Sequence, residues 1–247
     1  MRRCVLSILA AIGMIAGTAA ETRPDGTDAG FTPLFDGVGL AGWHVSSATS
    51  HSAASAHRSG GDWHVTDGAI VGTQDSPGNG GILVTDRLFG DIEVVLELRN
   101  DFGVDSGVFL RATEIGQAYQ VMIDYFPGGT IAGLYGEALP GGLDVRNFAF
   151  LDTPERIRPL PAAFALPIAP DEWQHLWKSD GWNELRARIV GNPPHIAAWI
   201  NGIRFLDFAD TERRLGDRGA IALQVHGGGD HRGQFVRFRN LRVKSLD

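Results

Sequence analysis

The stretch that decides the fold is DIEVVLELRNDFGVDSGVFLRATEIGQAYQVMID, residues 91–124, in which polar and apolar side chains alternate. Residues 92–98 carry apolar side chains at every even position and mostly charged side chains at the odd positions. A period of two is typical of a β-strand that has one face on a core and the other in water. We therefore predict three consecutive strands here, with Asp105-Ser106-Gly107 as the turn that leads into the second.

The third of these strands, YQVMID at residues 119–124, separates its side chains cleanly between two faces. Gln120, Met122 and Asp124 share one side, which we interpret as the floor of a binding site. Arg111 on the preceding strand joins that floor if the strand register allows it. The alternative is an ordinary salt bridge on a solvated sheet face.

Turn signals on both sides of this stretch indicate an all-β domain. Asp67-Gly68 and Asn201-Gly202 each separate two short strand-like runs, as in two-residue hairpins. Many short strands and no long helix predict an antiparallel β-sandwich, with a closed barrel as the alternative. Residues 46–61 and 138–171 are predicted to be long connections, the first of them exposed and the second with room for a short helix.

The first twenty residues, MRRCVLSILAAIGMIAGTAA, combine two arginines, an apolar run and a small-residue end. This pattern is typical of a cleaved secretory signal peptide, and the apolar run is short for a membrane span; an uncleaved anchor is the alternative. We expect a signal peptide at 1–20, a flexible leader at 21–30 and one domain at 31–247 in a secreted or periplasmic protein. Because Cys4 is the only cysteine, the mature domain would be held together without disulfides.

The charge of the chain favours a neutral ligand. The formal net charge is −7, and loss of Arg2 and Arg3 with the signal peptide leaves 20 basic against 29 acidic residues, or −9. Such a balance disfavours nucleic acid and anionic membrane as partners, so we expect no membrane contact beyond export. Six tryptophans and 33 glycines are typical of a turn-rich β protein that stacks aromatic rings on sugars. We expect a carbohydrate ligand, and the oligomeric state stays open.

A second strand and the aromatic residues supply further candidates. The run IALQVH, residues 221–226, places Gln224 and His226 on one face ahead of three glycines. Histidine exchanges protons near neutral pH, which suits catalysis, although a packed or surface histidine is the alternative. Trp173, beside the long connection, is a candidate cavity wall, whereas Trp182 at a strand start is interpreted as a core residue.

Several other sites are disfavoured. Glu93 and Glu97 lie roughly 13 Å apart along one strand, and an ordinary glycosidase pair needs about 5–10 Å, so we interpret both as polar-face residues. His51 and His57 have no carboxylate in compact ligand spacing, so no metal site is predicted. The sequence contains no Gly-x-Ser-x-Gly elbow, phosphate loop or dinucleotide fingerprint.

Nine segments, taken in their order and spacing, resemble the 3-keto-disaccharide hydrolase domain family. They are FTPLFDGVGLAGWHV, DWHVTDGAIVG, ILVTDRLFGDIEVVLELR, DSGVFLRA, YQVMIDY, GLYGE, GWNELRARIVGNPPHIAAWING, GAIALQVHGG and FRNLRVKSL. The resemblance covers residues 31–246 and implies a concanavalin A-like (lectin/glucanase) jelly roll exported from bacteria. It also implies hydrolysis of glycosides that are already oxidised to a ketone at C3. The family usually shows Asn-Ser-Gly where this chain has Asp105-Ser106-Gly107, so a carboxylate replaces an amide at a cleft position.

The resemblance also implies a set of site residues. A C3 ketone makes the C2 proton acidic, so one base at C2, one donor to the C3 oxyanion and one acid at the leaving oxygen suffice. The expected catalytic residues are Asp124 or His226 as the base and Tyr135 or Glu137 at the leaving group, while Arg111 and Gln120 hold the oxyanion or the sugar hydroxyls. The expected substrate-binding residues are Asp105, Ser106, Arg111, Gln120, Glu137, Trp173 and Gln224.

No cofactor is expected to be required, and a structural calcium ion would be compatible with this class of sandwich. A non-catalytic, lectin-like carbohydrate-binding module is the main alternative, because the same fold supports lectins. An ordinary glucanase is disfavoured because the chain lacks a Glu-x-Asp-x-x-Glu strand.

Overall fold

The computed structural model describes residues 29–100 and 105–247. The expected signal peptide at 1–20 and nearly all of the expected leader at 21–30 lie outside the described residues. Within the described ranges, no helix is long and apolar enough to cross a membrane.

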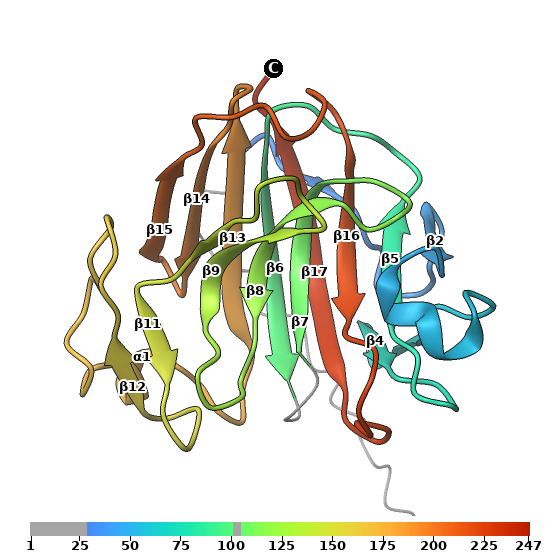
Figure 1. The fold of residues 1–247 in the computed structure, drawn as a ribbon, viewed down its shortest axis with the longest axis horizontal. Helices are drawn as coiled ribbons and strands as arrows, with labels where there is room; N and C mark the ends of the chain where they lie inside the picture. The colour runs from blue at the N-terminus through green and yellow to red at the C-terminus, as the bar shows by residue number, and fades with distance from the viewer. Residues whose placement is uncertain (1–28, 101–104) are drawn as a thin grey trace, which may run out of the picture.

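Two antiparallel sheets packed face to face form the body of the molecule (Figure 1). Sheet A has the order β15-β14-β13-β6-β17-β4-β3, with β1 paired to β17. Its strands are β1 (Thr32–Pro33), β3 (Asp62–Thr66), β4 (Ala69–Thr73), β6 (Ile92–Asn100), β13 (Asn183–Val190), β14 (His195–Ile200), β15 (Ile203–Ala209) and β17 (Val236–Ser245).

Sheet B has the order β10-β9-β8-β7-β16-β5-β2. Its strands are β2 (Trp43–Ser46), β5 (Gly81–Thr85), β7 (Ser106–Ala112), β8 (Ala118–Ile123), β9 (Ile131–Glu137), β10 (Asp144–Val145) and β16 (Ala220–Val225). A small third sheet pairs β11 (Phe148–Phe150) with β12 (Ile157–Pro159), and the short helices are η2 (Ser50–Ser55) and α1 (Trp173–Leu176). Both large sheets are open, so the predicted β-sandwich is confirmed and the barrel alternative is wrong.

The stretch from residue 91 to residue 124 forms the three predicted strands, but they do not share one sheet. β6 lies in sheet A, whereas β7 and β8 are neighbours in sheet B. The apolar positions of β6 and of β8 therefore meet in the core from opposite sides, with Leu96, Leu98, Tyr119 and Val121 at most 2% exposed. Each such residue contributes roughly 1.5–3 kcal/mol of burial free energy, which allows a sandwich to stand without disulfides.

The two predicted hairpin turns are confirmed by their backbone angles. Asp67 and Gly68 have φ of 52° and 73° between β3 and β4, and Asn201 and Gly202 have φ of 48° and 86° between β14 and β15. A two-residue turn with positive φ at both positions matches the twist of the strands that it joins, and Asx-Gly sequences adopt it at little steric cost.

The segment 46–61, predicted to be an exposed loop, packs against sheet B instead. It contains η2, in which His51, Ser52 and Ser55 are buried. The Ser52 hydroxyl donates a hydrogen bond to the Gly80 carbonyl at 2.9 Å. A Cβ on Gly227 would lie 1.9 Å from the His51 carbonyl oxygen, so the backbones touch there. Small side chains and glycine contacts let this polar segment bury its backbone against the sheet, which composition alone does not show.

Candidate active site

An open cavity of about 350 Å³ lies on the outer face of sheet B. It is found at the strand ends where β7 begins and its neighbours β8 and β16 end. Seven of the predicted site residues line it, namely Asp105, Gln120, Asp124, Tyr135, Glu137, Gln224 and His226. Ser50, His51, Met122 and Arg146 complete the lining. A cavity of this size accommodates a monosaccharide with part of a second ring.

Two glutamine side chains form the floor of the cavity. Gln120 and Gln224 are 2% and 1% exposed, and the Gln120 side-chain amide donates to the Gln224 side-chain oxygen at 2.9 Å. They come from β8 and β16, which lie on either side of β7. Gly107 of β7 makes this bridge sterically possible, because a Cβ at that position would lie 2.5 Å from Cγ of Gln120. The floor is therefore a rigid pair of amides rather than two independent side chains.

His51 is a cavity residue that sequence reasoning missed, as are Ser50 and Arg146. Its Nε2 atom lies 2.8 Å from the Gln224 side-chain nitrogen and 3.5 Å from Oε1 of Glu137. The Gly227 N–H donates to its Nδ1 atom at 3.4 Å. The sequence showed only a histidine in a Ser/Ala-rich segment, and nothing in the spacing signals a contact between residues 173 positions apart.

Three carboxyl groups, those of Asp105, Asp124 and Glu137, and the Arg146 guanidinium surround the floor. Burial, together with the negative charges of Asp124 and Glu137, raises the pKa of Asp105 to about 8. Its Oδ1 atom is buried and makes no hydrogen bond. Burial also raises the pKa of Asp124, against the opposing effects of the Phe126 N–H, which donates to it at 2.9 Å, and of Arg146. The cavity therefore holds a neutral carboxylic acid near pH 7.

His226 sits at the edge of the cavity with its ring against His51. The two ring centroids are 4.6 Å apart. The side chain reaches solvent, yet partial desolvation of the ring lowers the pKa of His226, and the charge of His51 lowers it further. His226 is thus held in its neutral form at neutral pH, which is the form that accepts a proton.

One exposed aromatic ring lines the cavity. Tyr135 lies on its wall and is 40% exposed. Flat rings that are half in water suit the apolar faces of sugars.

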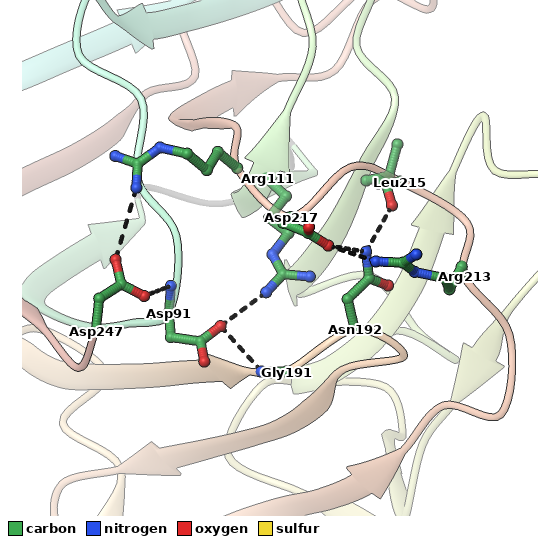
Figure 2. A network of polar contacts seen from close by, with 9 residues as sticks. Asp91, Arg111, Gly191, Asn192, Arg213, Leu215, Asp217 and Asp247 are labelled. Carbon is green, nitrogen blue, oxygen red and sulfur yellow. Dashed lines mark hydrogen bonds and ion pairs between the residues drawn. The ribbon is translucent and has the colours of Figure 1, made fainter.

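Arg111 lies outside the cavity, so the prediction that it shares a hollow with Gln120 and Asp124 is wrong. It comes six residues after Asp105 on β7, roughly 20 Å along the strand. Its Nη2 group donates to Oδ1 of Asp91 at 3.0 Å, and the same oxygen accepts the Gly191 N–H at 2.9 Å (Figure 2). Arg111 thus connects sheet B to sheet A. A β-bulge at this end of β7, where Arg111 has a φ of 54°, also breaks the side-chain alternation, so neither the face nor the position along the strand was as predicted.

Trp173 and Ser106 also differ from their predicted roles. Trp173 is fully buried, stacks on Trp177 at 5.4 Å and donates its indole N–H to the Pro154 carbonyl. Ser106 faces inward on β7 and donates its hydroxyl to the Gln224 backbone carbonyl at 2.5 Å. Both stabilise the scaffold and neither lines the cavity. Conversely Trp182, predicted to be core, is half-buried with the Arg239 guanidinium 4.1 Å above its ring.

The described residues contain no group of three or more His, Cys, Asp or Glu side chains arranged to hold a metal ion. Binding of a structural calcium ion, which the fold class allows, stays untested.

A family model, the 3-keto-alpha-glucoside-1,2-lyase-like domain, matches residues 30–244. The chain belongs to this family. The match covers both large sheets and every residue that lines the cavity. No curated protein is similar enough to match the chain.

Solved structures share the fold at low sequence identity. A protein from Parabacteroides distasonis, named as a glycosyl hydrolase, has a TM-score of 0.52 at 16% identity, covering 88% of this chain and 94% of its own. A second structure from the same organism, also named as a glycosyl hydrolase, has a TM-score of 0.51 at 17% identity and covers 87% and 99%. The carbohydrate-binding module CBM66 from Bacillus subtilis has a TM-score of 0.52 at 12% identity and covers 83% and 96%. The predicted concanavalin A-like jelly roll is confirmed.

Proposed function

We propose that this protein is an exported enzyme that cleaves 3-keto-glycosides by removing the C2 proton and expelling the group at C1. Family membership supports the substrate class, and the sequence of residues 1–20 supports export to the periplasm or medium. The observation that carries the proposal is one cavity in which a histidine is held neutral and an aspartic acid is held protonated. Two titratable groups in one cavity whose environments shift their pKa values in opposite directions form a natural base and acid.

His226 is the base that we assign to the C2 proton. Its lowered pKa leaves it unprotonated at neutral pH, and its place at the open edge lets a substrate reach it. Asp124 is the alternative base, and burial raises the pKa of its carboxyl group against the opposing effects of the Phe126 N–H and Arg146. His51, packed against the His226 ring and tied to Gln224, positions that base.

Asp105 is the acid that we assign to the leaving oxygen. Its carboxyl group is protonated below pH 8 or so, and its Oδ1 atom has no partner within the protein. Tyr135 and Glu137 stand on neighbouring positions of the cavity wall, where Tyr135 supports the departing sugar. The Gln120–Gln224 floor and Arg146 provide the donors for the C3 oxygen as it gains negative charge.

The electrons balance without an oxidant or a metal. The base takes the C2 proton, the C2–H electron pair becomes the C1=C2 double bond, and the C1–O bond breaks with its pair on the leaving oxygen. That oxygen takes the proton held by Asp105. Water then adds across C1=C2 to give the free 3-keto sugar: its oxygen bonds to C1, its released proton returns to the Asp105 carboxylate, and C2 takes its proton from the protonated base.

The test uses a nitrophenyl 3-keto-glucoside, whose cleavage releases a coloured nitrophenol. We expect turnover by the wild-type protein and a loss of roughly 10²–10⁴-fold in kcat for His226→Gln. Asp152→Asn, which alters an exposed carboxylate paired with Arg156, is the matched surface control and should keep full activity. Full activity in both His226→Gln and Asp124→Asn would rule out this site.

A carbohydrate-binding module without catalysis is the second candidate. It is favoured by the half-exposed Tyr135 at the cavity mouth and by the fold shared with CBM66. Saturable binding of a disaccharide, with no nitrophenol released from the 3-keto substrate, would establish this function instead.

A further inference from the structure

A buried glutamine, Gln74, contacts the loop that carries His226. It directly follows β4 of sheet A, where that strand ends near the end of β16 (Figure 1), and it is 3% exposed. The loop, residues 226–235, connects β16 of sheet B to β17 of sheet A. Gln74 does not line the candidate active site, so any effect that it has on the chemistry acts through this loop.

The amide of Gln74 directs both its nitrogen and its oxygen at the backbone of that loop. Its nitrogen donates to the His226 carbonyl at 2.8 Å and to the Gly228 carbonyl at 2.9 Å. Its side-chain oxygen accepts the His231 N–H at 3.0 Å. These partners fix the orientation of the amide, because only the nitrogen donates to carbonyls and only the oxygen accepts from an N–H. One side chain therefore holds three backbone groups of the loop.

The composition of the loop allows many backbone conformations. Residues 227–229 are three glycines, and Gly228 and Gly229 have φ of 85° and 68°. Glycine loses more conformational freedom on folding than any other residue, so such a segment is costly to order. Hydrogen bonds from a buried amide to the carbonyls on either side of Gly227 restrict the rotations that these glycines allow.

The backbone of His226 is held on both sides. Its N–H donates to the Asp105 carbonyl at 3.0 Å, and its carbonyl accepts the Gln74 amide. The assigned base is thus placed by one bond to the residue assigned as the acid and by one bond to Gln74. A displacement of about 1 Å in a reacting group can cost roughly a hundredfold in rate, so a contact outside the cavity bears on catalysis.

We propose that Gln74 is a positioning residue for the proposed reaction, because it holds the His226 backbone so that the imidazole ring stays packed against His51 in the cavity. The inference rests on the proposed function, since it takes His226 as the base. The two imidazole centroids are 4.6 Å apart, and both rings line the cavity. Without the Gln74 contacts, the loop is free to carry the His226 ring away from His51 and into water.

Such a movement has a predictable effect on the titration of His226. The titratable groups whose charges act on it are His51 from η2, Glu137 from β9 and His231 from its own loop. Desolvation and the charge of His51 are the two largest effects, and both lower the pKa of His226. Both weaken as the ring moves into water, so the pKa should rise toward its ordinary value.

The test compares Gln74→Met with Thr73→Val in the full chain. Methionine has a similar length and donates no hydrogen bond, so all three contacts with the loop are lost. Thr73 is the matched control, because it is the preceding residue, is also buried and donates its hydroxyl to the Gln234 carbonyl at 2.7 Å, at the other end of the same loop. We expect kcat on the nitrophenyl 3-keto-glucoside to fall roughly tenfold to a hundredfold in Gln74→Met, with KM nearly unchanged, and to stay at the wild-type value in Thr73→Val.

Proton NMR of the histidine rings, recorded without substrate, follows the titration of His226 in each variant. We expect the pKa of His226 to rise in Gln74→Met and to stay unchanged in Thr73→Val, while urea unfolding measures the stability that each variant loses. A purely structural role for Gln74 would lower stability and leave both kcat and the His226 titration unchanged, and that result would overturn the proposal.

A second variant and a separate readout complete the design. If Gln74→Met does not fold, Gln74→Glu keeps the shape of the side chain and the acceptor for the His231 N–H, and it removes the two donors. Its readout is kcat, because its charge acts on the histidine titration directly, and a wild-type kcat would again overturn the proposal. Absence of turnover in the wild-type protein contradicts the proposed function, whereas the His226 titration still decides whether Gln74 holds that residue in place.

Discussion

Replacing Asp105 by asparagine is expected to stabilise the protein, and more so at higher pH. Burial and the neighbouring carboxylates raise the pKa of Asp105 from 3.8 to about 8. The folded state therefore binds a proton that the unfolded state has already lost between these two values, and folding stability falls as pH rises across that window. At about 1.36 kcal/mol per pKa unit, the full penalty has an upper limit of about 6 kcal/mol above pH 8.

The measurable part is the change in that penalty with pH. Between pH 5 and pH 9 the upper limit is about 4 kcal/mol, and relaxation with water entry around a buried carboxylate reduces the expected difference to about 2 kcal/mol. Asparagine keeps the shape of the side chain and does not titrate, so the advantage of Asp105→Asn should be small at pH 5 and largest at pH 9.

Urea unfolding of the wild type and Asp105→Asn at pH 5, 7 and 9 measures this difference directly. Asp152→Asn, at an exposed ion pair, serves as the matched control and should show no such trend. A stability difference that stays flat from pH 5 to pH 9, or a destabilised Asp105→Asn at pH 9, would refute the reasoning that this carboxyl is buried and neutral.

Three other outcomes follow from the same structure. The pH profile of kcat/KM should be bell-shaped, because activity rises as His226 loses its proton and falls near pH 8 as Asp105 loses its own. Asp105→Asn should lose the decrease at alkaline pH, and steady-state rates from pH 4 to 10 measure both profiles. Gly107→Ala should reduce kcat/KM roughly tenfold or more, because the new Cβ would strike Gln120 and break the amide floor; a folded, fully active variant would contradict this. Arg111→Leu should lower the unfolding free energy by roughly 1–3 kcal/mol, because the half-buried Asp91 carboxylate loses its ion pair with the Arg111 guanidinium. KM should stay unchanged, so urea denaturation measures the effect on stability and steady-state kinetics measures the effect on the cavity.

The sequence predicted the parts of the fold that depend on local periodicity. The alternation in residues 119–123 correctly assigned Tyr119 and Val121 to the core and Gln120 to the cavity face, because strand parity is set by the chain itself. The turns at Asp67-Gly68 and Asn201-Gly202 were equally local, since each needs only two residues of positive φ.

The parts that depend on long-range placement were not predictable in the same way. Arg111 lies at the far end of β7, beyond a β-bulge that interrupts the side-chain alternation, and only the pairing with β16 shows that bulge. His51 reaches Gln224 through a segment whose burial depends on backbone contacts with Gly227, and composition describes that segment as a polar loop. Trp173 resembled a ligand platform because of its neighbourhood in sequence, yet it fills a cluster with Phe148.

The carboxylate at position 105 shows why the active site and the stability of the domain must be read together. Members of the family that this sequence resembles usually carry asparagine there, which fills the same space without a charge to desolvate. An aspartate whose Oδ1 atom is buried without a partner costs the fold free energy at neutral pH, whereas a neutral carboxylic acid offers a proton that asparagine cannot transfer. In the proposed mechanism, that transferable proton is what offsets the cost in stability. If Asp105→Asn gains stability and loses the alkaline limb together, proton transfer to the leaving oxygen explains both; a gain in stability with an unchanged profile would assign that proton to Tyr135 or Glu137.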